Sequence, residues 1–337
     1  MQIHQKFSLK NYNTFGIEAK AKQFVAVHNL DELKSVLEHH KNDKKFILGG
    51  GSNMLLTQDI DALVIHVDLL GKKVLKEDEN FVWVESNAGE NWHEFVLWTI
   101  EQDFGGLENM SLIPGNVGTT PVQNIGAYGA EIKDTFVSCD AMNIETQEMK
   151  TFTKSECNFG YRESIFKHEA KDKFIITSVV FKLTKCNHKI SVEYGDIKAE
   201  LVKNNITNPT IKDVSNAVIA IRQSKLPNPK ELGNSGSFFK NPVISREEFL
   251  KVLEKFPDVK YFEISKTEVK VPAGWLIEHA GLKGYRNGDA GVHKNQALVL
   301  VNYGSATGQD ILNLSKYVQK TVFDKYGIAI EAEVNVI

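Results

Sequence analysis

Strand and helix patterns alternate along the first third of the chain. Short apolar runs predict strands at 24–27, 46–48, 63–67 and 82–85. Leu33, Val36 and Leu37 share one face of a predicted helix that follows Asn29, a residue type favoured at helix N-caps. Apolar residues at helical spacing predict a second amphipathic helix within 91–102. Such alternation indicates an α/β or α+β domain.

The next segment, 105–131, has a different character. It holds six glycines, two prolines and few charged residues. A regular helix is therefore excluded, and the segment is too apolar for a solvated linker. Glycine lets a backbone approach a ligand closely, so this segment is expected to line a binding site. Strands are predicted beyond it at 137–144 and 174–183.

Helical spacing dominates the last third. Apolar faces predict helices at 213–221 and 249–256, and a polar, proline-bearing break lies between them at 226–232. A long helix is predicted over 310–326, because Gly327 follows it in the position that favours a left-handed C-terminal cap. The final run, 328–336, alternates apolar and polar residues and predicts a strand.

Composition narrows the class of protein. The 337 residues are 42% hydrophobic and 25% charged, as in a soluble globular protein of about two domains. The net charge of −3 provides no general attraction to nucleic acid or to an anionic membrane. No apolar run suits a signal peptide or a membrane span, and no tight histidine cluster indicates a metal. Three widely spaced cysteines without a C-x-x-C pair favour a reducing, cytoplasmic compartment.

Two glycine-rich loops are candidate cofactor sites. Residues 49–53, Gly-Gly-Gly-Ser-Asn, follow a predicted strand, and consecutive glycines allow N–H groups to converge on a phosphate. The loop is neither a Walker loop nor a Rossmann fingerprint, so a plain tight turn is about as probable. The second loop, 113–129, is longer, and Gln123 and Asn124 add hydrogen-bonding groups that suit a heterocyclic ring. Its alternative interpretation is a buried loop that packs on itself.

Several further residues carry chemistry only in combination. Arg162, in a short turn after Tyr161, can bind a carboxylate, although a lone arginine is more often a surface ion-pair partner. Ser237 lies among small residues beside two phenylalanines, where an ordinary turn serine is the simpler interpretation. Glu331 and Glu333 share the polar face of the final run, so one of them can project into a cleft, although surface glutamates are the commoner outcome. Lys225, at a predicted helix end, suits a cap as well as a phosphate contact.

Taken together, these segments resemble the UDP-N-acetylenolpyruvoylglucosamine reductase family. The matching motifs occur in the family's order over nearly the whole chain. Each motif alone has low specificity. The matching strings are 13–16 (Asn-Thr-Phe-Gly), 49–53, 89–92 (Gly-Glu-Asn-Trp), 106–109 (Gly-Leu-Glu-Asn), 113–129, 159–167, 236–242, 273–277 and 331–334.

The resemblance implies an α+β fold. It consists of an FAD-binding domain of the PCMH or vanillyl-alcohol-oxidase type, made of two α/β subdomains, and a separate α+β substrate-binding domain. The expected bounds are 17–186 for the first domain (subdomains about 17–68 and 69–186), 213–326 for the second, and 327–337 for a final strand that carries Glu333 back to the active site. No histidine lies in an evident flavin-attachment motif, so the FAD is expected to be non-covalent.

The resemblance also implies a reaction and its residues. NADPH reduces FAD, and flavin N5 then passes hydride to the enolpyruvyl ether, which gives UDP-N-acetylmuramate for peptidoglycan synthesis. Arg162 and Glu333 match the pair that stabilises the intermediate, and Ser237 matches the proton donor. Residues matched to substrate binding are Tyr161, Tyr194, Lys225, Ser237, Asn241 and Gln296. Residues matched to FAD binding are Gly49, Gly50, Gly51, Ser52, Asn53, Met54, Pro114, Gly115, Val117, Gly118, Thr119, Gln123, Asn124, Gly126, Ala127 and Tyr128.

Two departures from the family pattern and two alternatives accompany this interpretation. Asn335 stands where some relatives carry arginine, and Thr119 and Thr120 replace smaller residues, although their hydroxyls are able to donate to a cofactor.

The alternatives are an FAD-dependent oxidase of a small alcohol on the same scaffold, and a non-catalytic protein that binds a UDP-sugar or flavin. No nucleic-acid, membrane or obligate protein partner is expected.

Overall fold

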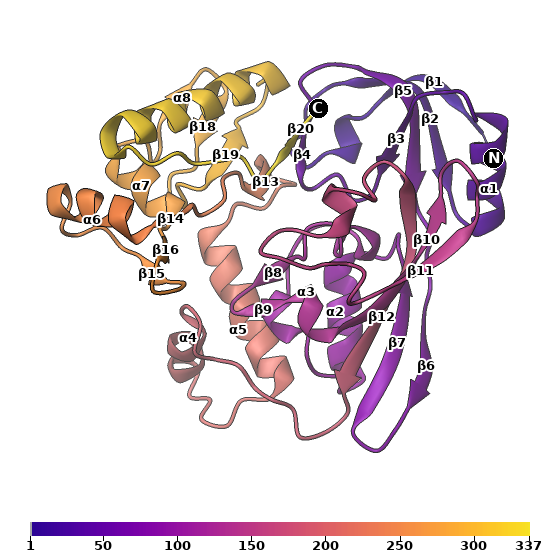
Figure 1. Cartoon of the computed structure of the whole chain (residues 1–337), viewed down its shortest axis with the longest axis horizontal. Coiled ribbons are helices and arrows are strands. Elements are labelled where there is room, and N and C mark those ends of the chain that lie inside the picture. The colour runs from indigo at the N-terminus through magenta and orange to yellow at the C-terminus, as the bar shows by residue number, and fades with distance from the viewer. Residues whose placement is uncertain (1) are drawn as a thin grey trace. The chain divides into compact units, whose positions relative to one another are not determined.

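The computed structural model describes residues 2–337 (Figure 1). The chain forms two compact units whose segments interleave in the sequence. The first unit comprises 2–7, 21–50 and 60–222, and the second comprises 8–20, 51–59 and 223–337. These units follow contacts rather than family boundaries, so the expected domain bounds of 17–186, 213–326 and 327–337 stay a prediction.

The first unit begins with a four-stranded sheet. Its strands, in the order β1-β2-β5-β3, are β1 (His4–Ser8), β2 (Lys20–Val27), β5 (Ile60–Val67) and β3 (Lys45–Leu48). Both β2 and β3 run parallel to β5, so a crossover is needed, and helix α1 (Leu30–His39) provides one. The Asn29 side chain accepts a hydrogen bond from the Glu32 N–H at 2.9 Å, which confirms the predicted N-cap.

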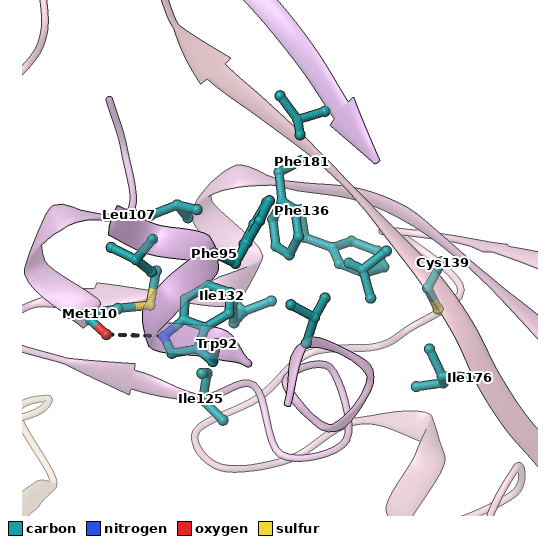
Figure 2. Packing of buried hydrophobic residues seen from close by; sticks show 14 of the residues in the cluster. Trp92, Phe95, Leu107, Met110, Ile125, Ile132, Phe136, Cys139, Ile176 and Phe181 are labelled. Carbon is teal, nitrogen blue, oxygen red and sulfur yellow. Dashed lines mark hydrogen bonds between the residues drawn. The ribbon is translucent and has the colours of Figure 1, made fainter. Parts of the chain in front are cut away.

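A five-stranded antiparallel sheet follows. In spatial order it comprises β11 (Met149–Thr153), β10 (Phe136–Asn143), β12 (Phe174–Thr184), β7 (Phe81–Asn87) and β6 (Lys72–Glu77). Helix α2 (Trp92–Glu101) places Trp92 and Phe95 against Phe181 of β12, with ring centroids 5.9 and 5.3 Å from that ring (Figure 2). Aromatic side chains of this size contribute much of the burial that stabilises a core.

The glycine-rich segment between these elements is irregular but anchored. It contains the short elements η2 (Glu108–Met110), η3 (Val117–Thr119), β8 (Gly126–Ala127), β9 (Ala130–Glu131) and α3 (Ile132–Thr135). Its apolar residues at five positions enter the same core as Trp92: Leu107, Met110, Val117, Ile125 and Ile132 (Figure 2). The Trp92 indole N–H donates to the Met110 carbonyl at 3.0 Å. The segment therefore has a defined course without regular secondary structure.

Two helices complete the first unit. They are α4 (Ile197–Lys203) and α5 (Ile211–Lys225), the latter ending beyond the unit's last residue. Buried residues of both helices form a cluster against which Tyr128 packs. Short helix η4 (Ile165–Lys167) follows the Arg162 turn.

The second unit is built on another four-stranded sheet. Its order is β13 (Gly233–Ser237), β19 (Val299–Asn302), β18 (Ala290–Val292) and β17 (Arg286–Asn287). The remaining elements of this unit are η1 (Lys10–Tyr12), β4 (Met54–Leu55), β14 (Val243–Ser245), α6 (Arg246–Lys255), β15 (Phe262–Glu263), β16 (Glu268–Lys270), α7 (Ala273–His279), α8 (Gly308–Tyr326) and β20 (Asn335–Val336). Gly327 ends α8 with φ +70°, as predicted.

The predicted final strand over 328–336 is wrong in its extent. Only Asn335–Val336 forms a strand, parallel to β4, and Ala332 makes one isolated bridge to Phe239. The apolar alternation persists, because Ile328, Ile330 and Val334 are buried. The backbone bonds of this run go to different segments in turn, including the Gln319 side chain and the Lys240 N–H. Residues 331–333 bond to 238–240 and residues 335–337 bond to 53–55, so no single ladder forms along the run.

We predict that the free energy of unfolding falls between pH 6.5 and 5. Burial lowers the pKa of His66, His93 and His293 below the ordinary 6.5. In that window the unfolded chain binds more protons than the folded one, so acidification favours unfolding. Each unit of pKa depression corresponds to about 1.4 kcal/mol before partial exposure reduces it. Denaturant titrations of the apoprotein from pH 7.5 to 5 measure the slope.

A matched pair of variants checks the cause. His66 lies on β5 and stacks on Phe24, whereas His4 is exposed on β1. His66→Gln should flatten the decline between pH 6.5 and 5, and His4→Gln should leave it as in the parent protein. Equal declines in all three proteins would contradict the assignment to the buried histidines.

Candidate functional site

The two glycine-rich loops meet in the first unit. A Cβ added to Gly50 would lie 2.7 Å from Asn116 Oδ1 and 2.9 Å from Gly115 Cα, and one added to Gly49 would lie 2.5 Å from Thr119 Cγ2. Real Cβ atoms do not approach other atoms so closely. The backbones of the loops, 65 residues apart in sequence, can therefore come together only because glycine is present. The two loops therefore lie against each other, and their binding of one cofactor stays a prediction.

The second loop is held in place by the turn before α2. The Gly118 N–H donates to the Ala88 carbonyl at 2.9 Å, and the Trp92 N–H donates to the Gly115 carbonyl at 3.0 Å. A Cβ on Gly118 would lie 2.4 Å from Ala88 Cβ. The close approach of Ala88 explains the glycine at 118, and a φ of +116° explains the glycine at 115.

The hydroxyls of Thr119 and Thr120 were expected to be able to donate to a cofactor, but both donate within the loop. The Thr119 hydroxyl donates to the Asn116 carbonyl and the Thr120 hydroxyl to the Val117 carbonyl, both at 2.7 Å. Each hydroxyl has only one proton, so in this arrangement it can offer a ligand its lone pairs but no hydrogen. Donation to a cofactor must come from other groups, chiefly backbone N–H.

Asn124 has a positioning role within the protein. It is fully buried with φ +45°, and its Nδ2 donates to Glu131 Oε2 at 3.1 Å and to the Gly160 carbonyl at 2.9 Å. Its Oδ1 accepts from the Lys133 N–H at 3.0 Å. The amide expected to face a heterocyclic ring instead ties the second loop to the turn that carries Arg162.

Arg162 is joined to the same loop. Its Nη2 donates to the Gly126 carbonyl at 2.9 Å, and its backbone has φ +57°, an unusual conformation for a non-glycine residue. Lys167 Nζ donates to the Arg162 carbonyl at 3.0 Å, and the guanidinium lies 5.6 Å from the Tyr161 ring centroid. Strained residues of this kind concentrate at functional sites. The Arg162 guanidinium is therefore a cation held against the second glycine-rich loop.

Two tyrosines lie at the end of the second loop. Tyr194 is 51% exposed and packs against Gly129, whose added Cβ would lie 3.4 Å from Tyr194 Cβ. Tyr128 packs against Gly195 in the same way, at 3.5 Å. Asn109 connects their segments, because its Nδ2 donates to the carbonyls of Tyr128 and Ser191, both at 3.0 Å. Asn109 was visible in the Gly-Leu-Glu-Asn string but was assigned no role from the sequence.

The rest of the first glycine-rich loop belongs to the second unit. Gly51 has φ +60°, and its added Cβ would lie 1.9 Å from the Tyr12 carbonyl oxygen. The Asn53 carbonyl accepts from Asn335 Nδ2 at 2.9 Å, and Asn53 Nδ2 donates to the Glu333 carbonyl at 3.4 Å. Asn335 therefore anchors the C-terminal segment through a neutral hydrogen bond. Met54, expected near the cofactor, is 6% exposed within this structure.

Ser237 and Glu333 lie on adjoining segments of the second unit. Ser237 is exposed at the end of β13, opposite Val299 of β19. The Glu333 N–H donates to the carbonyl of Phe238 at 2.8 Å, directly after Ser237. Phe238 itself is fully buried, and its carbonyl joins the backbone beside Ser237 to that of Glu333. These two residues, 96 apart in sequence, therefore lie on neighbouring backbone segments, and their functional roles stay a prediction.

The remaining substrate candidates of this unit have mixed roles. Asn241 Oδ1 accepts from the Ala273 N–H at the start of α7, at 3.0 Å, which leaves its amide group as the end that can donate to an anion. Gln296 lies in the turn before β19, where its carbonyl accepts from the Val299 N–H at 3.1 Å. Lys225 ends α5 and is exposed.

Comparisons with known proteins identify these features. A profile described as FAD binding domain matches residues 21–151, and one described as UDP-N-acetylenolpyruvoylglucosamine reductase, C-terminal domain, matches 228–337. A UDP-N-acetylenolpyruvoylglucosamine reductase of Flavobacterium johnsoniae is 77% identical over 337 residues and covers 100% of both chains. One from Chromobacterium violaceum is 47% identical, covering 99% of this chain and 98% of its own.

A solved structure supports the fold. The UDP-N-acetylenolpyruvylglucosamine reductase of Thermus caldophilus is 24% identical, covers 99% of this chain and 98% of its own, and superposes with a TM-score of 0.67. The fold and the glycine-rich cradle define an FAD-dependent oxidoreductase with a PCMH-type domain and a separate C-terminal domain. Within that class, the chain belongs to the UDP-N-acetylenolpyruvoylglucosamine reductase family.

The residues present suit FAD. Gly49 and Gly50 let the backbone of the first loop pack closely against the second, and backbone N–H groups of such glycine-rich loops bind diphosphate. Among residues 2–337, no group of three histidine, cysteine, aspartate or glutamate side chains is arranged to hold a metal ion. Within the same range, no helix combines the length and apolar character needed to cross a bilayer.

Proposed function

We propose that the protein reduces UDP-N-acetylglucosamine enolpyruvate to UDP-N-acetylmuramate with NADPH, in the cytoplasmic synthesis of peptidoglycan precursors. The names of its relatives support the substrate, and the three free cysteines suit a reducing compartment. The observation that carries the proposal is the backbone hydrogen bond from Glu333 to Phe238, which puts Ser237 and Glu333 on adjoining segments; Arg162, held by the Gly126 carbonyl, adds support.

Arg162 has the chemistry to stabilise developing charge. When bound and reduced by NADPH, FAD would supply hydride to the terminal vinyl carbon of the substrate, and the electron pair displaced by this addition would move toward the substrate carboxylate. A guanidinium already fixed by the Gly126 carbonyl lowers the free energy of that charge without reorganising. Glu333 is proposed to act with Arg162 in organising this charge, since its backbone is fixed by Phe238.

Ser237 is proposed to donate the proton that completes the reduction. Hydride and proton together convert the vinyl group to the lactyl ether, and NADPH plus one proton balances the reaction. The Ser237 hydroxyl is exposed at a strand end, so substrate and solvent can both reach it. Its proton is then restored from water, and the residue leaves the cycle unchanged.

The substrate-binding set is also proposed. Tyr161 and Tyr194 present exposed rings beside the cofactor loop, where they can cover a sugar or a carboxylate. Lys225, Asn241 and Gln296 are assigned to the diphosphate of the UDP group and its surroundings, because an ammonium and carboxamide N–H groups are suitable donors to phosphate oxygens.

An anaerobic single turnover tests the function. FAD on the purified protein is reduced with stoichiometric NADPH, and UDP-N-acetylglucosamine enolpyruvate is then added while the absorption of oxidised flavin is followed. Rapid return of that absorption, with UDP-N-acetylmuramate formed, is the expected result. Flavin that stays reduced until air is admitted would favour the alternative oxidase and overturn the proposal.

A further inference from the structure

Strand β13, which pairs with β19 in its sheet (Figure 1), contains an irregularity directly before Ser237. Asn234 pairs with Val301 of β19. The next pair joins Ser237 to Val299, so a step of three residues along β13 corresponds to a step of two along β19. Such a bulge with one extra residue reverses the alternation of side chains between the two faces of a sheet. Ser237 therefore stands on the same face as Val299, and Phe238 points to the opposite face.

The bulge determines which side chain reaches solvent. Ser237 is exposed, whereas Phe238 is fully buried. The Phe238 ring packs on those of Phe15 and Phe239, with centroids 6.3 and 5.1 Å away. Without the extra residue, the alternation would turn Phe238 toward the face that Ser237 now occupies. The geometry of the bulge thus decides whether a hydroxyl group is presented at this position.

The Asn234 side chain holds the bulge. Its Oδ1 accepts a hydrogen bond from the Gly236 N–H at 2.9 Å, two residues ahead in the chain. A carboxamide that bonds to the backbone two residues ahead is a common way of fixing a turn. Gly236 has φ +71°, a left-handed conformation that glycine adopts readily. Because Gly236 directly precedes Ser237, this hydrogen bond sets the direction in which the backbone enters Ser237.

The carboxamide itself is fixed from its other end. Asn234 is 1% exposed, and its Nδ2 donates to the carbonyls of Leu232 at 2.8 Å and Pro227 at 3.1 Å. A rotated amide would turn its oxygen toward two carbonyls and its N–H groups toward the Gly236 N–H, so only one orientation satisfies both ends. Both donors are used within the protein, and Asn234 therefore has no hydrogen to offer a ligand.

We propose that Asn234 is a positioning residue for the reaction, because its carboxamide holds the bulge that presents the Ser237 hydroxyl for proton donation. The inference rests on the proposed function, in which Ser237 is the proton donor. Asn234 acts through Ser237 and touches neither the substrate nor the cofactor. The hydroxyl and the hydrogen bonds that aim it therefore form one functional unit.

Asn234→Ala tests the inference. Loss of the Gly236 hydrogen bond should displace Ser237, and a misplacement of about 1 Å can cost about 10²-fold in rate. Oxidation of the reduced flavin by UDP-N-acetylglucosamine enolpyruvate should slow by about that factor, whereas reduction of FAD by NADPH should keep the parent rate. Anaerobic stopped-flow absorption measures both half-reactions. Asn234→Ser keeps a weaker acceptor for the Gly236 N–H and should recover part of the rate.

Asn302→Ala is the matched control. Asn302 is also buried in this sheet, and its Oδ1 accepts from the Gly304 N–H, two residues ahead, at 2.9 Å. Its Nδ2 donates to the Phe15 carbonyl at 3.1 Å, and it pairs with Gly233, at the other end of β13 from Ser237. Its loss should lower the Tm, as the loss of Asn234 does, but should leave substrate reduction at the parent rate. Equal slowing in both proteins would overturn the inference, because a merely structural role predicts it.

A double variant links the effect to Ser237. In a Ser237→Ala background, Asn234→Ala should slow substrate reduction no further, because the effects of residues that act as a unit do not add. Full additional slowing there, or substrate reduction at the parent rate in Asn234→Ala alone, would overturn the inference. If Asn234→Ala does not fold, Asn234→Ser is compared with Asn302→Ser in the same way. A parent rate in Ser237→Ala would instead reveal failure of the proposed proton donor, and the inference would fail with it.

Discussion

Ser237→Ala is expected to slow oxidation of the reduced flavin by the enolpyruvyl substrate about 10²- to 10⁴-fold, the range that a positioned general acid contributes. Reduction of FAD by NADPH should keep its parent rate, because that half-reaction requires no proton from this serine. The fold should also persist, since the side chain is exposed at the end of β13. Anaerobic stopped-flow absorption measures the two half-reactions separately.

Ser235→Ala is the matched control for this variant. Ser235 lies two residues earlier on the same strand, and its buried hydroxyl has no hydrogen-bond partner among residues 2–337. Its loss should affect neither half-reaction and should leave stability unchanged or slightly improved, because no hydrogen bond is broken. Substrate reduction at the parent rate in Ser237→Ala would remove this serine from the proposed mechanism.

Gly50→Ala is expected to abolish stable FAD binding, with a loss of affinity of at least about 100-fold. The new methyl group would lie 2.7 Å from Asn116 Oδ1 and 2.9 Å from Gly115 Cα. The Asn116 side chain can rotate away, but the backbone at Gly115 is held by the Trp92 N–H. The loops must therefore separate, and overpacking of this kind costs about 1–3 kcal/mol before the cofactor is considered. Equilibrium dialysis or flavin fluorescence measures the remaining affinity.

Gly274→Ala provides the comparison for this change. Gly274 lies in α7 of the second unit, where the added Cβ would meet the Leu298 side chain at 3.3 Å, a contact that a flexible side chain can relieve. Alanine also favours the helix by roughly 1 kcal/mol. FAD affinity should match the parent, and a Gly50→Ala protein that purifies with full FAD would show that the two loops do not form the cradle.

Much of the fold followed from local patterns, and the failures have specific causes. Asn29, Gly327 and the amphipathic helices were predicted correctly because caps and periodicity act within one or two turns. The strand expected over 328–336 has the correct alternation, but alternation records only which side chains are buried. It does not record whether one neighbouring strand is long enough to pair with the run. Here successive residues pair with different segments.

The sequence predicted which residue types the site contains better than it predicted the contacts that each residue makes. Glycines at 49, 50, 115 and 118 were expected where the backbone approaches a ligand; the structure shows the two loop backbones packed against each other, and contact with a ligand stays a prediction. Asn124 was expected to face the cofactor, and in the structure its amide forms hydrogen bonds within the protein. An amide donates and accepts in the same way with a ligand or with protein groups, so residue type alone cannot distinguish the two partners.

The sequence by itself determined the local elements, the positions where only glycine fits, and the family whose motifs run along the whole chain. These depend on backbone sterics and hydrophobic periodicity, which act between residues near one another in the chain. The tertiary structure decided which backbones meet and which polar groups form hydrogen bonds within the protein. Those outcomes depend on contacts between residues such as Gly50 and Gly115, or Phe238 and Glu333, that only the folded chain brings together.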